Sequence, residues 1–262
     1  MNRYLRVYTA FLRNCLAKEL EYRTSFILRA VGNLAHGAVS LLFLSLVFRH
    51  VQAIAGWTIN QGILLMGTFL LFQGILGFIF SENMERISSY VNRGELDFIL
   101  TKPISSQFYV STRLISWDNL PRILLGVAVI LYALRQLGSV PTPAQVALYL
   151  ILLITGLVIG YSLWFLSIIY VFWTERLRNA GFIFHSFTEL GRIPIQAFKG
   201  ISRYLLTFVL PIAFMTTTPT ESLLGIVTLS GTGTGLFLAT ILFLCANRMW
   251  RVGLRAYSSA SS

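Results

Sequence analysis

Long uninterrupted blocks of apolar residues constrain this chain more than any other feature. They follow one another along the 262 residues, and the longest covers about residues 145–173. A block of about 18 or more apolar residues matches the hydrocarbon core of a bilayer, whereas a soluble helix shows only a narrow apolar stripe. Charged residues make up 12% of the chain, too few to cover a soluble surface of this size. The sequence therefore predicts an all-α integral membrane protein.

The apolar blocks also give the bounds of the expected spans. Residues 180–198 and 201–219 are both apolar enough to be considered, and Pro211 and Pro219 interrupt the second stretch. We expect 180–198 to cross, ending near Pro194, and 201–219 to form a re-entrant hairpin inside the protein or beside a water-filled cavity. The reverse assignment keeps the same topology and stays open. The six expected spans cover about residues 26–48, 61–80, 119–138, 145–173, 180–198 and 222–246.

The distribution of Lys and Arg predicts the orientation, because cytoplasmic loops of membrane proteins collect these residues. With both termini in the cytoplasm, 16 of the 21 Lys and Arg residues fall inside. A seventh span would move Arg248, Arg251 and Arg255 outside, so only one of the two ambiguous stretches crosses. The net charge of +11 then reflects topology, and we expect no nucleic-acid partner. The five outer residues are Arg49, Arg135, Arg192, Lys199 and Arg203.

Residues 3–22 form an amphipathic segment ahead of the first span. At the helical repeat, Arg3, Arg6 and Arg13 gather on one face. A helix of this kind lies in the plane of the lipid headgroups, so we expect an N-terminal interfacial helix. The alternative is a basic flank that only orients the first span. The opposite, apolar face holds Tyr4, Val7, Tyr8, Phe11, Leu12 and Cys15.

The polar stretch 81–118, between the second and third spans, is the most informative part of the sequence. Ser81 is suited to cap a short helix that exposes Glu82, Glu85 and Arg86. Gly94 suits the left-handed position that ends a helix. Pro103 is expected to end the next short helix, before Ser105 starts another. The opposite side of the first short helix carries Met84, Ile87 and Val91.

An apolar run follows Gly94, and a solvated loop has no reason to carry it. The run consists of Leu96, Phe98, Ile99 and Leu100. Together with the charged helix before it, this run favours a surface that binds a soluble cytoplasmic partner over the alternative of a plain solvated loop.

The order of these features resembles that of type-2 ABC permeases, the membrane subunits of bacterial exporters such as the daunorubicin-resistance class. The resemblance covers nearly the whole chain. It rests on the architecture and on the pattern Arg93-Gly94-Glu95-Leu96-Asp97 followed by Lys102-Pro103. It implies two permeases, identical or homologous, and two cytoplasmic ATPases that bind ATP and Mg²⁺, in the bacterial inner membrane. Export, rather than import, is also implied by the resemblance alone.

The resemblance further implies roles for particular segments. Residues 82–92 would be the coupling helix that contacts the ATPase, and the turn 174–179 would be a second contact. The hairpin 201–219 would line the outer gate. The implied ATPase-coupling residues are Glu82, Glu85, Arg86, Tyr90, Arg93, Gly94, Asp97, Glu175 and Arg176.

The chain has no phosphate-binding loop of its own, because no G-x-x-x-x-G-K-[ST] motif occurs in it. The glycine-rich run Gly231–Gly235 lacks the lysine and lies inside an apolar block. We interpret it as a small-residue packing surface, like Gly156 and Gly160. We therefore expect no catalysis and no cofactor in this chain, with ATP hydrolysis on a partner subunit.

Ionisable groups inside predicted spans are candidates for function. Glu189 and Arg192 are three residues apart and can form an ion pair on a helix. The pair is either a polar point in the translocation path or dimer seam, or a structural pair near the outer interface. His36, His50 and His185 show no metal-ligand spacing, so no metal site is expected. The candidate path and gate residues are Glu189, Arg192, Pro194, Pro211 and Pro219.

Two other classes of function stay open. An ion-coupled secondary transporter normally carries intramembrane acid or histidine relays and repeated halves, which are not recognisable here. An intramembrane lipid-modifying enzyme would need a motif such as H-E-x-x-H or G-x-S-x-G, and Ser230-Gly231 is only a weak lead. The spans carry mostly Phe, Leu, Ile and Gly, so an amphipathic or lipidic cargo is expected, although no residue names it.

Overall fold

The computed structural model describes residues 3–173 and 180–257, and this part of the chain folds almost entirely into helices. Five stretches within it are long and apolar enough to cross a membrane, and a bent pair of helices makes a sixth if it is counted as one span. The prediction of an all-α integral membrane protein is confirmed. The five stretches are α2 (Arg23–His50), α3 (Ile59–Asn92), Trp117–Leu137 with α6 (Leu120–Leu137), Pro143–Phe172 with α7 (Pro143–Ile169), and α11 (Leu229–Ala256).

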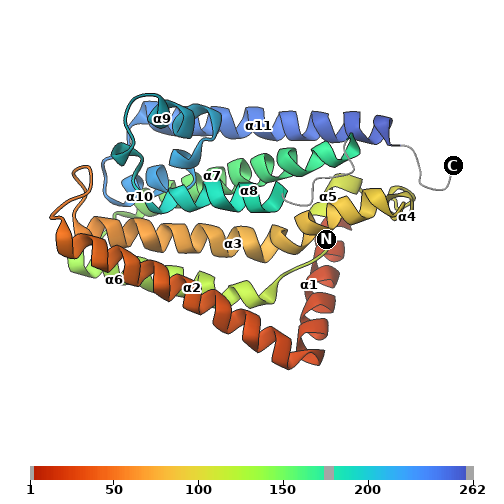
Figure 1. The fold of residues 1–262 in the computed structure, drawn as a ribbon, viewed down its shortest axis with the longest axis horizontal. Helices are drawn as coiled ribbons and strands as arrows, with labels where there is room; N and C mark the ends of the chain where they lie inside the picture. The colour runs from red at the N-terminus through yellow and green to blue at the C-terminus, as the bar shows by residue number, and fades with distance from the viewer. Residues whose placement is uncertain (1–2, 174–179, 258–262) are drawn as a thin grey trace.

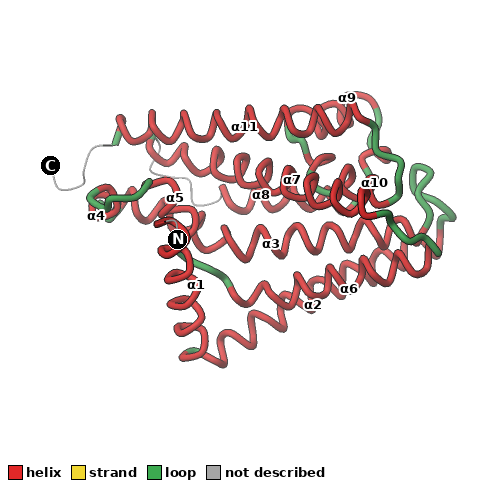
Figure 2. Tube along the Cα trace, turned by 180° about the vertical axis from the view of Figure 1, so that it is seen from behind, coloured by secondary structure: helices red, strands yellow, loops and turns green. Residues whose placement is uncertain are grey.

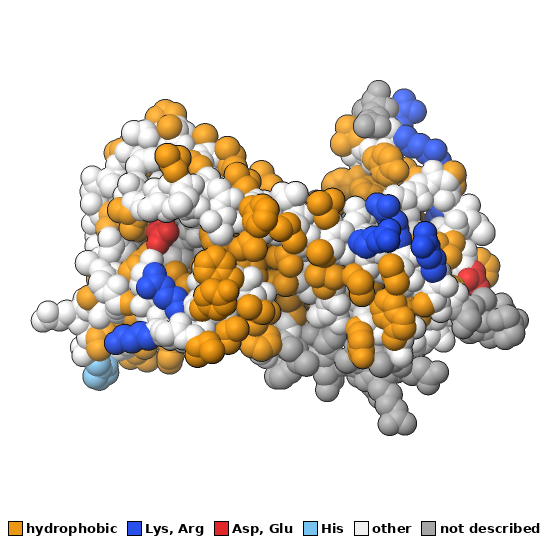
Figure 3. Space-filling model, turned by 90° about the horizontal axis from the view of Figure 1, so that it is seen from above, with side chains coloured by type: hydrophobic (Ala, Val, Ile, Leu, Met, Phe, Trp, Pro, Cys, Tyr) orange, Lys and Arg blue, Asp and Glu red, His pale blue; other side chains and the backbone are white. Residues whose placement is uncertain are grey.

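The long helices lie side by side, and α1 (Arg3–Glu21) crosses one end of them at a steep angle (Figure 1). The short helices α4 (Leu96–Leu100) and α5 (Ser106–Thr112) lie at the same end, whereas α9 (Gly200–Tyr204) and α10 (Thr217–Leu223) lie at the opposite end (Figure 2). We call these ends the α1 end and the α9 end. On one face, hydrophobic side chains form a central band, with Lys and Arg side chains gathered toward both ends (Figure 3).

The apolar face of α1 packs on protein, which differs from the expected contact with lipid. Arg3, Arg6 and Arg13 are exposed, as the amphipathic pattern predicts, and Cys15 is buried. The ring of Phe11 meets that of Tyr109 edge-on at 5.6 Å between centroids. α1 is therefore attached to α5 through side chains that we had expected to face the membrane lipids.

α3 is the central helix, and it packs most closely along α6. The contact is close because glycines remove side chains from it: a Cβ added at Gly126 would lie 2.6 Å from the Leu71 nitrogen. A Cβ at Gly67 would lie 2.9 Å from the Ile130 nitrogen. Such small residues allow backbones to approach when there is no hydrophobic driving force between helices.

α3 is much longer than a bilayer requires. Its 34 residues correspond to about 51 Å, against a hydrocarbon core of about 30 Å. If α3 crosses upright, about 14 residues extend beyond the core. The charged residues from Glu82 onward are consistent with that extension. Ser81 does not cap a separate helix, as the sequence had suggested, because its hydroxyl donates to the Gly77 carbonyl within α3. The helix ends beside Gly94, whose φ of +71° confirms the expected left-handed stop.

The fifth passage is shorter and more broken than the helix expected over 180–198. α8 (Ala180–Thr188) ends after nine residues, and two 3-10 turns follow, η3 (Glu189–Arg192) and η4 (Ile195–Ala197). Pro194 lies between these turns. The break is held in place by α10 and the residue before it, because Thr216 donates to the Gly191 carbonyl at 2.7 Å and the Ile195 N–H donates to the Thr217 hydroxyl.

The stretch expected as a hairpin is a bent pair of helical segments. Gly200–Val209 and Ile212–Leu223 meet at 63°, with Pro211 at the break. Pro219 does not break it, since this proline lies in the first turn of α10, where no intrahelical N–H is needed. Both α9 and α10 stay at the α9 end (Figures 1 and 2). The last span begins at Leu229, so residues 222–228 precede it rather than belonging to it.

The glycines predicted to allow close helix packing do so in α7, but most of those in α11 do not. At Gly156 a Cβ would meet the Met215 backbone at 2.8 Å, and at Gly160 it would meet the Phe72 ring at 2.9 Å. Within the predicted run of α11 only Gly235 meets another element, at Phe214, whereas Gly233 has open space around it. The interpretation is confirmed in α7 and wrong for most of the run in α11.

Candidate functional site

The extension of α3 and the helix that follows it form a projection at the α1 end, which we call the α3–α4 tip (residues 82–103). One side of it is packed against the protein, with Met84 and Ile87 fully buried and Leu96 equally so. The other side is exposed and carries Glu85, Arg86 and other charged residues. The predicted division into an apolar and a charged side is therefore confirmed, on a continuous helix rather than a separate one.

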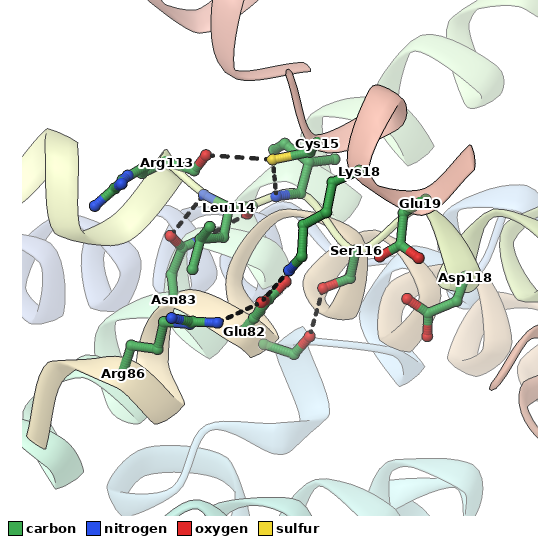
Figure 4. Close-up of polar contacts among 12 residues, drawn as sticks. Cys15, Lys18, Glu19, Glu82, Asn83, Arg86, Arg113, Leu114, Ser116 and Asp118 are labelled. Atoms are coloured by element: carbon green, nitrogen blue, oxygen red, sulfur yellow. Dashed lines mark hydrogen bonds and ion pairs between the residues drawn. The ribbon is translucent and has the colours of Figure 1, made fainter. Parts of the chain in front are cut away.

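Asn83 attaches the base of the tip to the chain returning toward α6. Its side-chain amide donates to the Leu114 carbonyl at 2.6 Å, and its carboxamide oxygen accepts from the Leu114 N–H at 2.9 Å (Figure 4). The amide also donates to the Ile79 carbonyl. Asn83 is 1% exposed. A buried carboxamide with these partners fixes the direction in which α3 leaves the bundle.

Glu82 links the tip to α1. Its carboxylate lies 3.5 Å from the Lys18 ammonium group and 3.1 Å from the Arg86 guanidinium group (Figure 4). Glu85 lies on the part of α3 that extends beyond the bilayer core. Partial desolvation by the groups around it raises the pKa of the Glu85 carboxyl, the charge of Glu82 raises it further, and Arg86 opposes both. On the charged face, Glu82 is thus paired with Lys18 and Arg86. The ionised form of Glu85 is less favourable than that of a carboxyl in water.

The apolar run after Gly94 divides between core and surface. Leu96 and Ile99 are buried, whereas Phe98 is 75% exposed and Leu100 is 42% exposed. Aromatic side chains surrounded by charged ones are typical of the anchors of protein interfaces. Phe98 is therefore the residue of the tip best placed to enter a pocket on a partner.

The residues predicted to couple to a partner do not all lie on this exposed face. Glu85, Arg86 and Arg93 are exposed. Tyr90 is buried, and its burial raises the pKa of its hydroxyl, with the nearby Arg113 opposing the shift. Asp97 is partly buried and lies beside Tyr257; burial and this carboxylate both raise the pKa of the Tyr257 hydroxyl. Glu175 and Arg176 lie outside the described residues.

Cys15 joins α1 to the base of the tip, a role that the sequence did not indicate. Its thiol donates to the Arg113 carbonyl at 3.6 Å and accepts from the Ile115 N–H at 3.4 Å (Figure 4). The two partners are about a hundred positions away in the chain, so only the tertiary structure reveals the contact.

A second polar network, also not predicted, connects α1, α2 and the start of α6. Arg29 lies 2.5 Å from Glu19 and 3.8 Å from Asp118. Asn33 donates to the Asp118 carboxylate at 3.0 Å and accepts from Arg122 at 2.9 Å. The members from α1 and α2 lie far from Asp118 and Arg122 in the sequence, so only the fold brings them together.

The structure places Glu189 and Arg192 in a side-chain ion pair, as their spacing predicted. His36 of α2 lies 3.6 Å from the Glu189 carboxylate, which adds a third member from a distant helix. Pro194 follows this cluster closely in the chain. Pro211 lies at the bend of the following segment, and Pro219 is buried in α10. The cluster therefore joins two of the five candidate path residues, with Pro194 nearby in sequence.

These features define a class: a multi-pass helical membrane protein with a charged helical projection at one end of its bundle. The family model described as "ABC-2 family transporter protein" matches residues 34–261, so the chain belongs to that family. It is thus a membrane component of type-2 ABC transporters, as the resemblance implied, and this family implies an ABC ATPase as its partner. Searches of curated proteins and of solved structures each found no match.

Proposed function

We propose that this chain is the permease subunit of an ATP-driven exporter and that its ATPase partner docks on the α3–α4 tip. The observation that carries the proposal is Phe98, 75% exposed at the end of an ordered, charged projection. Exposed aromatic side chains of this kind supply binding energy when a partner pocket covers them.

The continuity of α3 supports this coupling route. Up to Asn92 the tip is part of α3, the helix that packs on α6 and α7 through the bundle, and α4 with Phe98 follows after the turn at Gly94. A displacement of the tip by a partner therefore has to move α3 inside the membrane. Interhelical contacts as close as that of Gly126 transmit such movement, because packed interiors resist compression.

The remaining parts of the proposal concern assembly, location and cargo. Two ATPases would bind ATP and Mg²⁺, and two permease chains, identical or homologous, would enclose the path in the bacterial inner membrane. The α1 end would face the cytoplasm, which the excess of Lys and Arg at that side supports. The α9 end would form the outer gate, with the Glu189 cluster in or beside the path. An amphipathic or lipidic cargo fits the apolar composition of the spans.

Co-purification with a charge introduced into the anchor tests the docking. In mild detergent, the tagged wild-type chain should recover an ATPase subunit, recognised by its phosphate-binding loop, in equal amounts. Phe98→Asp should reduce this recovery about tenfold or more, because burying an unpaired carboxylate in an interface is strongly unfavourable. Ile201→Asp is the matched control, since Ile201 is 78% exposed at the α9 end.

Recovery of the ATPase by Ile201→Asp but not by Phe98→Asp supports the proposal. Equal recovery by both variants contradicts the docking site, and absence of an ATPase from the wild-type preparation contradicts the function itself.

A further inference from the structure

A cavity of about 420 Å³ lies where α3, α5, α7 and α11 meet. It is separate from the α3–α4 tip and from the Glu189 cluster. Its apolar walls include Phe80 of α3 and Leu157 and Val158 of α7. The volume falls within the range of small-molecule sites in proteins.

One edge of the cavity is polar and ordered by hydrogen bonds. The Tyr161 hydroxyl accepts from the Gln107 amide at 3.2 Å and shares a hydrogen bond with the Ser111 hydroxyl at 2.9 Å. All three side chains are buried. A network of this kind presents hydroxyl and amide groups in fixed positions inside an otherwise apolar site.

Asn247 of α11 adds a carboxamide that has no hydrogen bond to any other described residue. Its side chain is partly exposed and lines the cavity. A carboxamide that faces an otherwise apolar cavity without a partner is unfavourable, because the apolar walls offer neither donors nor acceptors. The group is therefore available to a ligand in the cavity.

The cavity opens sideways between apolar residues. Ile154 and Phe243 line it and are 60% and 41% exposed, so they stand at its mouth. Among the described residues that line it, none is Lys, Arg, Asp or Glu. The site thus combines an uncharged polar edge with an apolar exit toward the position of the lipid chains.

We propose that this cavity binds an amphipathic molecule with an uncharged, hydroxyl- or amide-bearing headgroup and a hydrocarbon chain. The headgroup would contact Asn247 and the Gln107–Tyr161 edge, and the chain would leave past Ile154. A charged headgroup would be desolvated without a counter-charge, and a purely apolar ligand would leave Asn247 without a partner.

The position of α5 gives the site a route to the docking end. Gln107 and Ser111 belong to α5, and the neighbouring Ser106 accepts from the Trp250 indole of α11 at 3.1 Å. α5 follows α4 directly in the chain and packs against it. That the ligand is cargo, or controls ATP hydrolysis, rests on the proposed function, whereas binding itself does not.

Photoaffinity labelling of the full chain in phosphatidylcholine nanodiscs tests the binding. The probe is a diacylglycerol with a diazirine on one acyl chain, compared with a phosphatidic acid carrying the same chains. We expect the diacylglycerol probe to label α7 around residues 154–161 and α11 around residues 243–247, about tenfold more than the anionic probe.

Two variants locate the site. Ile154→Trp should block the mouth and reduce labelling about tenfold, while Ile151→Trp, at another exposed position on α7 outside the lining, should not. Asn247→Leu should reduce the preference for the diacylglycerol probe even if Ile154→Trp does not fold. Equal labelling by both probes, or equal labelling of Ile154→Trp and Ile151→Trp, overturns the proposal. Neither readout depends on an ATPase, so failure here is distinct from failure of the proposed function.

Discussion

The carboxamide of Asn83 makes three hydrogen bonds at the point where the chain returns from α5 toward α6. Two of them satisfy the N–H and the carbonyl of a single residue, Leu114. Nothing in the sequence distinguished Asn83 from its neighbours, because its partner lies 31 positions away. The same holds for Cys15, Asp118 and Arg122. Residues of this kind acquire a role only through contacts that the fold creates.

Removing this carboxamide should destabilise the base of the α3–α4 tip. Asn83→Ala leaves the Leu114 N–H and carbonyl without these partners in a partly buried site, and each costs up to about 1–3 kcal/mol. We expect the melting temperature in detergent to fall by about 5–10 °C. Asn92→Ala, at an exposed position on the same helix, is the control. Equal melting temperatures for the two variants would contradict the role of Asn83.

The raised pKa of Glu85 predicts a pH-dependent effect of its neutralisation. Since the folded protein binds this proton more tightly than the unfolded chain, ionisation of Glu85 destabilises the folded state above the raised pKa. The penalty diminishes as pH falls through the raised pKa and is gone below the ordinary pKa of the carboxyl. Glu85→Gln should therefore stabilise the protein slightly at neutral pH, by less than about 1 kcal/mol after solvent screening. At acidic pH, unfolding curves of variant and wild type should coincide; a larger gain at acidic pH contradicts this account.

At the scale of elements, the apolar spans could be predicted from the sequence and their continuity could not. The second span was expected to stop near Phe80, because Ser81 can cap a helix. It continues because Asn83 and the buried Met84 and Ile87 hold the next turns against the bundle. For the fifth passage, the sequence predicted more continuity than the structure has. Its hydropathy suggested one helix, but the helix breaks near Gly191 and Pro194, and Thr216 just before α10 bonds to the broken segment.

The glycine contacts between α3 and α6 make a sharp prediction for one position. Gly126→Ala places a Cβ 2.6 Å from the Leu71 nitrogen, so the helices must separate, and overpacking of this kind costs about 1–3 kcal/mol. Gly32→Ala is the matched control, because no atom lies within 4 Å of its added Cβ. That variant should gain up to about 1 kcal/mol of helix stability. Equal unfolding free energies would show that α3 and α6 are not in close contact.

At the scale of the whole molecule, the positive-inside pattern predicts that the two ends of the bundle face opposite sides of the membrane. Phe98→Cys and Ile201→Cys place exposed thiols at the α1 end and the α9 end. A membrane-impermeant maleimide should label Ile201→Cys in intact cells and Phe98→Cys only in inverted vesicles. The unmodified chain controls for the native Cys245, which is exposed. Labelling of Phe98→Cys from outside would invert the topology.

The docking of a separate ATPase on the α3–α4 tip is the central claim, and site-specific cross-linking in membranes tests it most directly. A photoreactive phenylalanine analogue placed at Phe98 should cross-link to the ATPase subunit, while the same analogue at Ile201 should not. The account predicts a cross-linked band that contains both chains, from Phe98 only. Absence of that band in membranes that contain the ATPase, or its appearance from Ile201, would contradict the account.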